Sequence, residues 1–200
     1  MKKSMTVLEI LLGLLVLIIA IVNLYPFKFF NIQTGAEIMM YGIILSGVSM
    51  LIVGIFRLAS VYSYESLSLA EKINVVTSIL TMAMSVVIFF FQLFMTGSRW
   101  LHLLFGIGLL SYAIGRVTIG VLTSEINSGL RAYYSAIGMG IAVLSIITIS
   151  FQMVQISSGV NGTVYITYGY FVDATLIMIG VDFLISAILG IVLRRQKQSP

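Results

Sequence analysis

The order of apolar and polar residues along the chain predicts six membrane-spanning helices. Six apolar segments of about 20 residues or more alternate with short polar stretches, and a helix of that length crosses a hydrocarbon core of about 30 Å. The stretches between them leave no room for a soluble catalytic domain. We therefore predict an all-α, polytopic helical membrane protein that forms one transmembrane domain over residues 1–200. The six segments are 5–24, 38–61, 73–94, 101–122, 132–155 and 170–193.

A repeated pattern groups these segments in pairs. The second segment ends in Gly54-Ile55-Phe56-Arg57-Leu58, and the fourth carries a similar Ala113-Ile114-Gly115-Arg116-Val117. An apolar helix that bears an arginine near its end therefore occurs twice. This predicts three repeated hairpins, at about 5–61, 73–122 and 132–193, arranged around a pseudo-threefold axis or as a flat bundle.

Composition and charge support a membrane location. The chain is 60% apolar and 9% charged, whereas roughly a quarter of residues are charged in soluble domains. If both termini lie in the cytoplasm, nine of the 11 basic residues lie on that side, which is a strong positive-inside signal. We predict a multi-pass protein of the cytoplasmic membrane, with a net charge of +4 that reflects anchoring rather than nucleic-acid binding. The nine residues are Lys2, Lys3, Arg57, Lys72, Arg116, Arg131, Arg194, Arg195 and Lys197.

Residue types that carry most enzyme chemistry are scarce. Cysteine is absent, which removes disulfides, thiolate nucleophiles and thiolate metal ligands. A single histidine, His102, does not favour a metal site, and it is interpreted as an interfacial anchor beside Trp100, with a pH sensor as the alternative. Glycine pairs such as Gly106 and Gly108 lie inside apolar segments, where they serve packing. We predict a non-enzymatic protein without catalytic residues, cofactor or metal.

Asp182 is the most informative polar residue. It lies twelve residues before Arg194, about 18 Å from the cytoplasmic end of its helix and near the bilayer centre. A charge there costs at least roughly 2.5–3.5 kcal/mol, so Asp182 requires a partner or a proton. Arg116 is the candidate partner, although the two side chains lean apart. Tyr112 and Ser111 are the alternatives.

Two interpretations of Asp182 follow. In the structural one, its carboxylate is hydrogen-bonded within the bundle and holds the repeats in register, while Arg57 and Arg116 anchor helix ends. In the functional one, it titrates as a proton or ion passes. Glu9 is interpreted as an interfacial carboxylate favoured by the helix dipole, with a proton carrier as the alternative. Asp173 and Glu37 are expected at the solvated outer interface, or lining a vestibule there.

Small residues recur along two of the segments. Such spacings let helix backbones approach closely in lipid. They predict self-association or docking with other membrane protein subunits. These residues are Gly42, Ser46, Gly47 and Gly54 in the second segment, and Ala132, Ala136 and Gly140 in the fifth.

The chain also resembles the HdeD-type acid-resistance membrane proteins. The resemblance rests on Gly13-Leu14-Leu15-Val16-Leu17 leading to Pro26, on the arginine repeat, and on Gly180-Val181-Asp182-Phe183-Leu184. It implies an integral inner-membrane protein of six helices, linked in some members to survival in acid, with no catalytic residues to carry over. The leading expectation is thus a stress or acid-resistance protein that acts through helix–helix interaction or as a complex subunit. The alternative is a small proton- or ion-coupled transporter or channel that uses Asp182.

Overall fold

The computed structural model describes residues 3–24, 35–61, 68–94, 100–123, 126–150 and 163–198. These residues form six α-helices and no strand, and each helix is long and apolar enough to cross a membrane. The predicted all-α fold with six spans is therefore confirmed. The helices are α1 (Lys3–Leu24), α3 (Gly35–Val61), α4 (Leu69–Phe94), α5 (Leu101–Leu122), α6 (Ser128–Ser150) and α7 (Thr163–Gln198).

The helix bounds follow the predicted segments closely, with one large difference. α5 spans 101–122 as predicted, and α7 extends from Thr163 to Gln198, well beyond the predicted 170–193. Its last residues include arginine, lysine and glutamine, which have high helix propensity, so polarity ends the span without ending the helix. The part of the predicted fifth segment after Ser150 lies outside the described residues.

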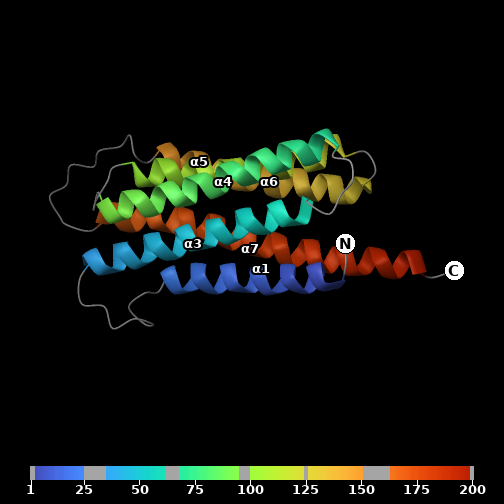
Figure 1. Ribbon diagram of the computed structural model, residues 1–200, viewed down its shortest axis with the longest axis horizontal. Helices are drawn as coiled ribbons and strands as arrows, with labels where there is room; N and C mark the ends of the chain where they lie inside the picture. Colours follow the sequence, from blue (N-terminus) through green and yellow to red (C-terminus); the bar gives the residue numbers. More distant parts are fainter. Residues whose placement is uncertain are drawn as a thin grey trace.

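The six helices run side by side along the long axis of the molecule (Figure 1). α1 begins and α7 ends at the same end of the bundle, which we call the terminal end. The opposite end, where α1 ends and α7 begins, is called the distal end. α7 extends past the other helices at the terminal end (Figure 1).

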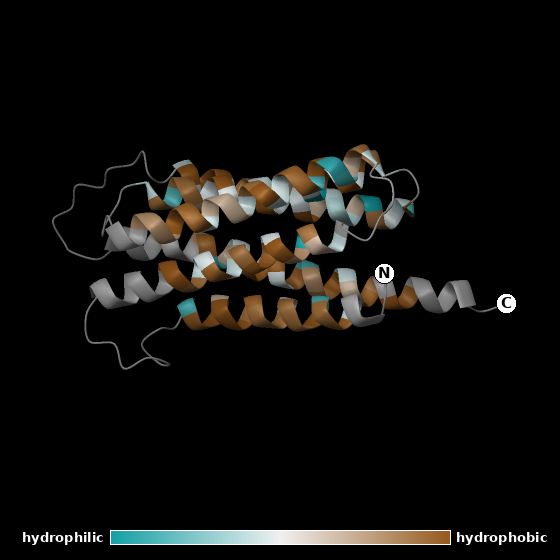
Figure 2. Ribbon diagram, in the orientation of Figure 1, coloured by the Kyte–Doolittle hydropathy of each residue, from teal (hydrophilic) through white to brown (hydrophobic). Residues whose placement is uncertain are grey.

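Three helices form the inside of the bundle. α3, α5 and α7 contact one another, and each of α1, α4 and α6 packs against two of them. In the membrane-spanning windows of α3, α5 and α7, 50%, 56% and 50% of residues are buried, against 28%, 33% and 22% in α1, α4 and α6. The outer helices present apolar side chains outward, and α1 is hydrophobic along most of its length (Figure 2). In a bilayer these surfaces contact lipid.

The structure does not show three hairpins as separate packing units. α1 packs more extensively against α7 than against α3, and α6 packs more extensively against α5 than against α7. Glycines explain the first pairing. A Cβ atom on Gly13 would lie 3.0 Å from the carbonyl oxygen of Gly180, and the reverse distance is also 3.0 Å. Backbones this close favour α1 and α7 as neighbours.

Most of the small residues predicted to bind other chains are used within this one. Gly47 faces the ring of Phe89 on α4, and Gly54 faces Met82 on the same helix. On α6, Gly140 faces Met178 of α7. The side chains that remain exposed in this set are Ala132 and Ala136 of α6. Gly42 lies outside the described side chains.

Candidate functional site

Asp182 lies at the centre of a buried polar network. Its carboxylate oxygen Oδ2 forms an ion pair with Arg116 Nε and accepts a hydrogen bond from the Tyr112 hydroxyl at 2.5 Å. Its Oδ1 accepts a hydrogen bond from the Tyr133 hydroxyl at 3.1 Å and lies 3.5 Å from the Ser186 hydroxyl. Asp182 itself is fully buried. The carboxylate is therefore surrounded by donors on both of its oxygens.

Helical spacing on two inner helices builds this network. Tyr112 and Arg116 lie four residues apart on α5, and Asp182 and Ser186 lie four apart on α7, so each pair shares one helix face. Arg116 also donates through Nη2 to Ser186 Oγ at 3.3 Å and through Nε to the Tyr112 hydroxyl at 3.2 Å. α5 and α7 are in direct contact, which brings the two faces together despite the opposed lean of the side chains. Tyr133 completes the network from α6.

Ser111, the other alternative partner, does not reach the carboxylate. Its hydroxyl donates to the carbonyl oxygen of Ile107, one turn earlier on α5, at 2.8 Å. This is the usual outcome for a serine inside an apolar helix, because the preceding carbonyl is always within reach.

The second arginine of the repeat joins the same network. Arg57 donates through Nη1 to the Tyr112 carbonyl oxygen at 3.3 Å and through Nη2 to Asn74 Oδ1. Its guanidinium carbon lies 4.4 Å from the centre of the Tyr112 ring, which is a cation–π contact. Gly115 makes the space, since a Cβ atom there would collide with the guanidinium.

The two arginines were expected to anchor helix ends, but their side chains are buried, so this expectation is wrong. Arg57 is 4% exposed and Arg116 is 8% exposed, so both side chains lie inside the bundle. Carboxylate, carbonyl, amide and ring groups take the place of water around them. We call Arg57, Tyr112, Arg116, Tyr133, Asp182 and Ser186 the arginine–aspartate network.

Glu9 provides a further charge beside this network. It lies on α1 with 7% exposure, so its side chain is buried rather than spread along the interface. Its carboxyl interacts electrostatically with Arg116 and with Asp182. Two guanidinium and two carboxyl groups therefore gather between α1, α3, α5 and α7.

A second polar cluster lies nearer the distal end. Asn23 Nδ2 of α1 donates to Ser46 Oγ of α3 at 3.0 Å and to Asp173 Oδ1 of α7 at 3.2 Å. Asp173 is 6% exposed, so the expected solvated helix end is wrong for this residue. The side chain of Glu37 lies outside the described ones. We call Asn23, Ser46 and Asp173 the distal cluster.

Apolar side chains separate the two clusters. Leu176 and Ile179 lie between the two aspartates on α7, and Met50 and Val53 lie between Ser46 and Arg57 on α3. All four apolar side chains are almost completely buried. Phe183, next to Asp182, packs edge-on against the rings of Phe56 at 5.4 Å and Tyr112 at 6.3 Å.

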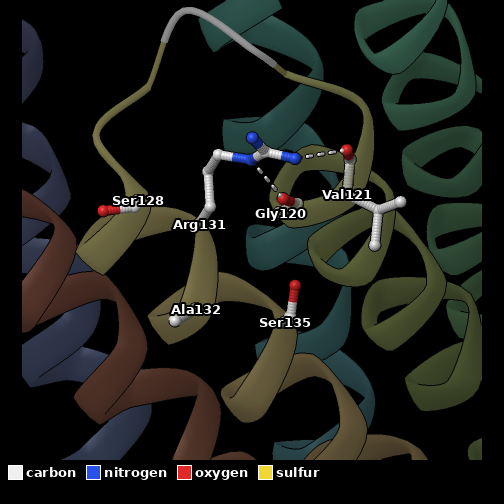
Figure 3. Close-up of a pocket in the computed structure, with 6 residues that line it drawn as sticks. All are labelled: Gly120, Val121, Ser128, Arg131, Ala132 and Ser135. Atoms are coloured by element: carbon white, nitrogen blue, oxygen red, sulfur yellow. Dashed lines mark hydrogen bonds between the residues drawn. The ribbon is translucent and has the colours of Figure 1, made fainter.

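A shallow hollow of about 280 Å³ opens between the end of α5 and the start of α6 (Figure 3). Arg131 donates through Nε to the Gly120 carbonyl oxygen at 3.2 Å and through Nη2 to the Val121 carbonyl oxygen at 3.1 Å. The arginine thus satisfies carbonyl groups at the end of α5, where a positive charge also meets the helix dipole favourably. Arg131 therefore ties the start of α6 to the end of α5.

Two residues that bind the buried charges were not singled out from the sequence: Asn74, the partner of Arg57, and Tyr133, a partner of Asp182. Asn74 belongs to a row of buried polar residues on α4, spaced three or four apart, which is a recognisable signal in an apolar helix. Tyr133 gave none, because its role depends on how α6 packs. The row on α4 consists of Asn74, Thr77, Ser78, Thr81 and Ser85.

Neither cluster has the composition of a metal site. Within the described ranges, no group of three His, Cys, Asp or Glu side chains could hold a metal ion. His102 is half-buried at the start of α5. No protein-family model, curated protein or solved structure matches the chain. The similarity to HdeD-type proteins stays a prediction.

Proposed function

We propose that the protein is a non-enzymatic integral membrane protein in which the arginine–aspartate network joins the helices, and that it acts through contacts with other membrane-embedded chains. Six apolar helices support the membrane location. The observation that carries the proposal is that both carboxylate oxygens of Asp182 already have partners, namely an arginine and three hydroxyl groups.

A transported proton or ion would have to displace these donors from Asp182. Removing one partner of a buried ion pair is strongly destabilising, because the remaining charge is left uncompensated. The donors come from α5 and α6 as well as α7 itself, so the contacts hold three helices together. This arrangement favours a fixed structural aspartate over a working ion carrier.

The remaining parts of the proposal concern location and partners. We place the protein in the cytoplasmic membrane with both termini in the cytoplasm, because this puts most basic residues on the inside. The outer face of α6 is the proposed contact with a second copy or another subunit, in a stress or acid-resistance role. It exposes two alanines next to larger apolar side chains. The face consists of Ala132, Ala136, Met139, Val143 and Ile146.

Asp182→Asn tests the structural proposal against transport. The substitution keeps the size of the side chain but removes the charge that Arg116 requires. We expect a loss of unfolding free energy of about 3 kcal/mol in detergent, and no proton or cation flux in proteoliposomes of either the wild type or the variant. Flux in the wild type that disappears in a stably folded variant would contradict the proposal.

The contact through α6 needs a separate experiment. Ala136→Trp places a large ring on the exposed face without touching the arginine–aspartate network. We expect the protein to migrate as a complex on a native gel after gentle solubilisation, and the variant to migrate as a monomer. Val7→Trp on the lipid-facing side of α1 is the matched control. A wild-type protein that runs as a monomer would remove this part of the proposal.

A further inference from the structure

Asp173 is a buried carboxylate that forms no ion pair with any side chain in the described part of the chain. It is 6% exposed, and the groups that act on it are its apolar surroundings and the amide of Asn23. An amide N–H is a neutral donor, and one such bond compensates a buried negative charge only in part. Asp173 therefore lacks the compensation that Arg116 gives Asp182.

The surrounding helices offer little charge at this level of the bundle. α1 contributes Asn23 and α3 contributes Ser46. On α5 the titratable residue nearest the distal end is His102, and α6 has no titratable residue from Gly138 to Ser150. Glu37 and Tyr41 of α3 lie outside the described side chains. No described side chain forms an ion pair with Asp173.

The distal cluster lies closer to the distal end of the bundle than Asp182 does. Asn23, which donates to Asp173, is the last residue but one of α1, and α1 ends at Leu24. Asp182 lies nine positions further along α7, about 14 Å farther from the distal end. The Asp173 carboxyl group is thus shielded by protein yet close enough to the distal end to exchange a proton with the aqueous phase.

We propose that the distal cluster is a proton-binding site, in which Asp173 carries a proton at neutral pH and exchanges it with the distal side of the membrane. Protonation removes the uncompensated charge, while Asn23 keeps its hydrogen bond to the neutral carboxyl. The same face of α3 carries Ser49, whose hydroxyl is completely buried without a hydrogen-bond partner among the described residues. The inference is independent of the role proposed for Asp182.

Infrared spectroscopy of the full-length protein tests this site. We expect the wild type to show the carbonyl band of a neutral carboxylic acid at pH 7, and the band to decrease as the pH rises toward 10. Asp173→Asn should lose this band, and Asp182→Asn, the matched control on the same helix, should retain it. Absence of the band in the wild type, or its persistence in Asp173→Asn, would overturn the proposal.

Two further measurements keep the test decisive if Asp173→Asn does not fold. Asn23→Ala removes the donor to Oδ1, so we expect the same band at a higher frequency, and an unmoved band would contradict the assignment. Titrations in choline and in sodium buffers separate a proton from a metal cation. We expect the band to have the same intensity in both buffers. A band that sodium abolishes at constant pH would show that the site binds a metal cation, and would overturn the proposal of a proton site.

Discussion

The two aspartates of α7 show how differently one helix can use the same side chain. Asp173 and Asp182 are both buried, and nine residues separate them, which is about 14 Å along the helix. Asp182 meets a guanidinium group and hydroxyl groups from three helices, and Asp173 meets one neutral amide. The comparison teaches that burial alone does not assign a role to an intramembrane carboxyl group. The charge of its partners decides whether it is fixed or free to bind a proton.

The largest loss of stability is expected when Asp182 loses the arginine that compensates its charge. Arg116→Met removes the ion pair and leaves Asp182 buried with hydroxyl donors alone. We expect a loss of about 3–5 kcal/mol in the free energy of unfolding, measured by denaturant titration in detergent. Arg131→Met, which loses bonds to two carbonyl groups at the end of α5, should lose about 1 kcal/mol. Equal losses in the two variants would show that the buried ion pair stabilises the fold no more than the hydrogen bonds of Arg131 do.

Arg57 should matter less than Arg116, because its described hydrogen-bond partners are neutral. Arg57→Met removes the bonds to Asn74 and to the Tyr112 carbonyl oxygen, together with the cation–π contact. We expect a loss of about 2 kcal/mol by the same titration. A loss larger than that of Arg116→Met would mean that Arg57, and not the Asp182 pair, is the main support of the network.

The close approach of α1 and α7 holds both clusters in place, since Glu9 and Asn23 lie on either side of it along α1. Gly13→Ala inserts a methyl group 3.0 Å from the Gly180 carbonyl oxygen. We expect a loss of about 1–3 kcal/mol from overpacking, detected as a lower unfolding temperature. Gly129→Ala, where the nearest atom to an added Cβ is 3.8 Å away, is the matched control and should change little.

The smallest effect is expected on the uncompensated side at low pH. At about pH 4 the unfolded chain can carry the Asp173 proton as well, so Asp173→Asn, which replaces a protonated carboxyl with a neutral group of similar shape, should change the free energy of unfolding by less than about 1 kcal/mol. The pH dependence should differ more. Above this pH the unfolded chain releases the proton while the folded state keeps it, so stability falls as the pH rises, and the unfolding temperature of the wild type should fall between pH 5 and pH 8. Asp173→Asn should show a smaller fall, and parallel curves would contradict the protonated state.

The spans were predictable because bilayer thickness sets the length of an apolar helix. Which helices pack against each other was not predictable, because apolar helix faces in lipid have no preference for one another. Close contacts such as that of Gly13 with Gly180 decide the pairing. Depth along the helix singled out Asp182, and the arginine repeat pointed to Arg57 and Arg116. Depth does not tell which way a side chain faces, so the burial of Glu9 and Asp173 could not be predicted.

The most direct test of the central claim is a double-mutant cycle in the free energy of unfolding, made of Arg116→Met, Asp182→Asn and the variant with both substitutions. We expect the loss in the double variant to be clearly smaller than the sum of the two single losses, because each single variant leaves its buried partner without the compensating group. Losses that simply add up would contradict a fixed structural ion pair.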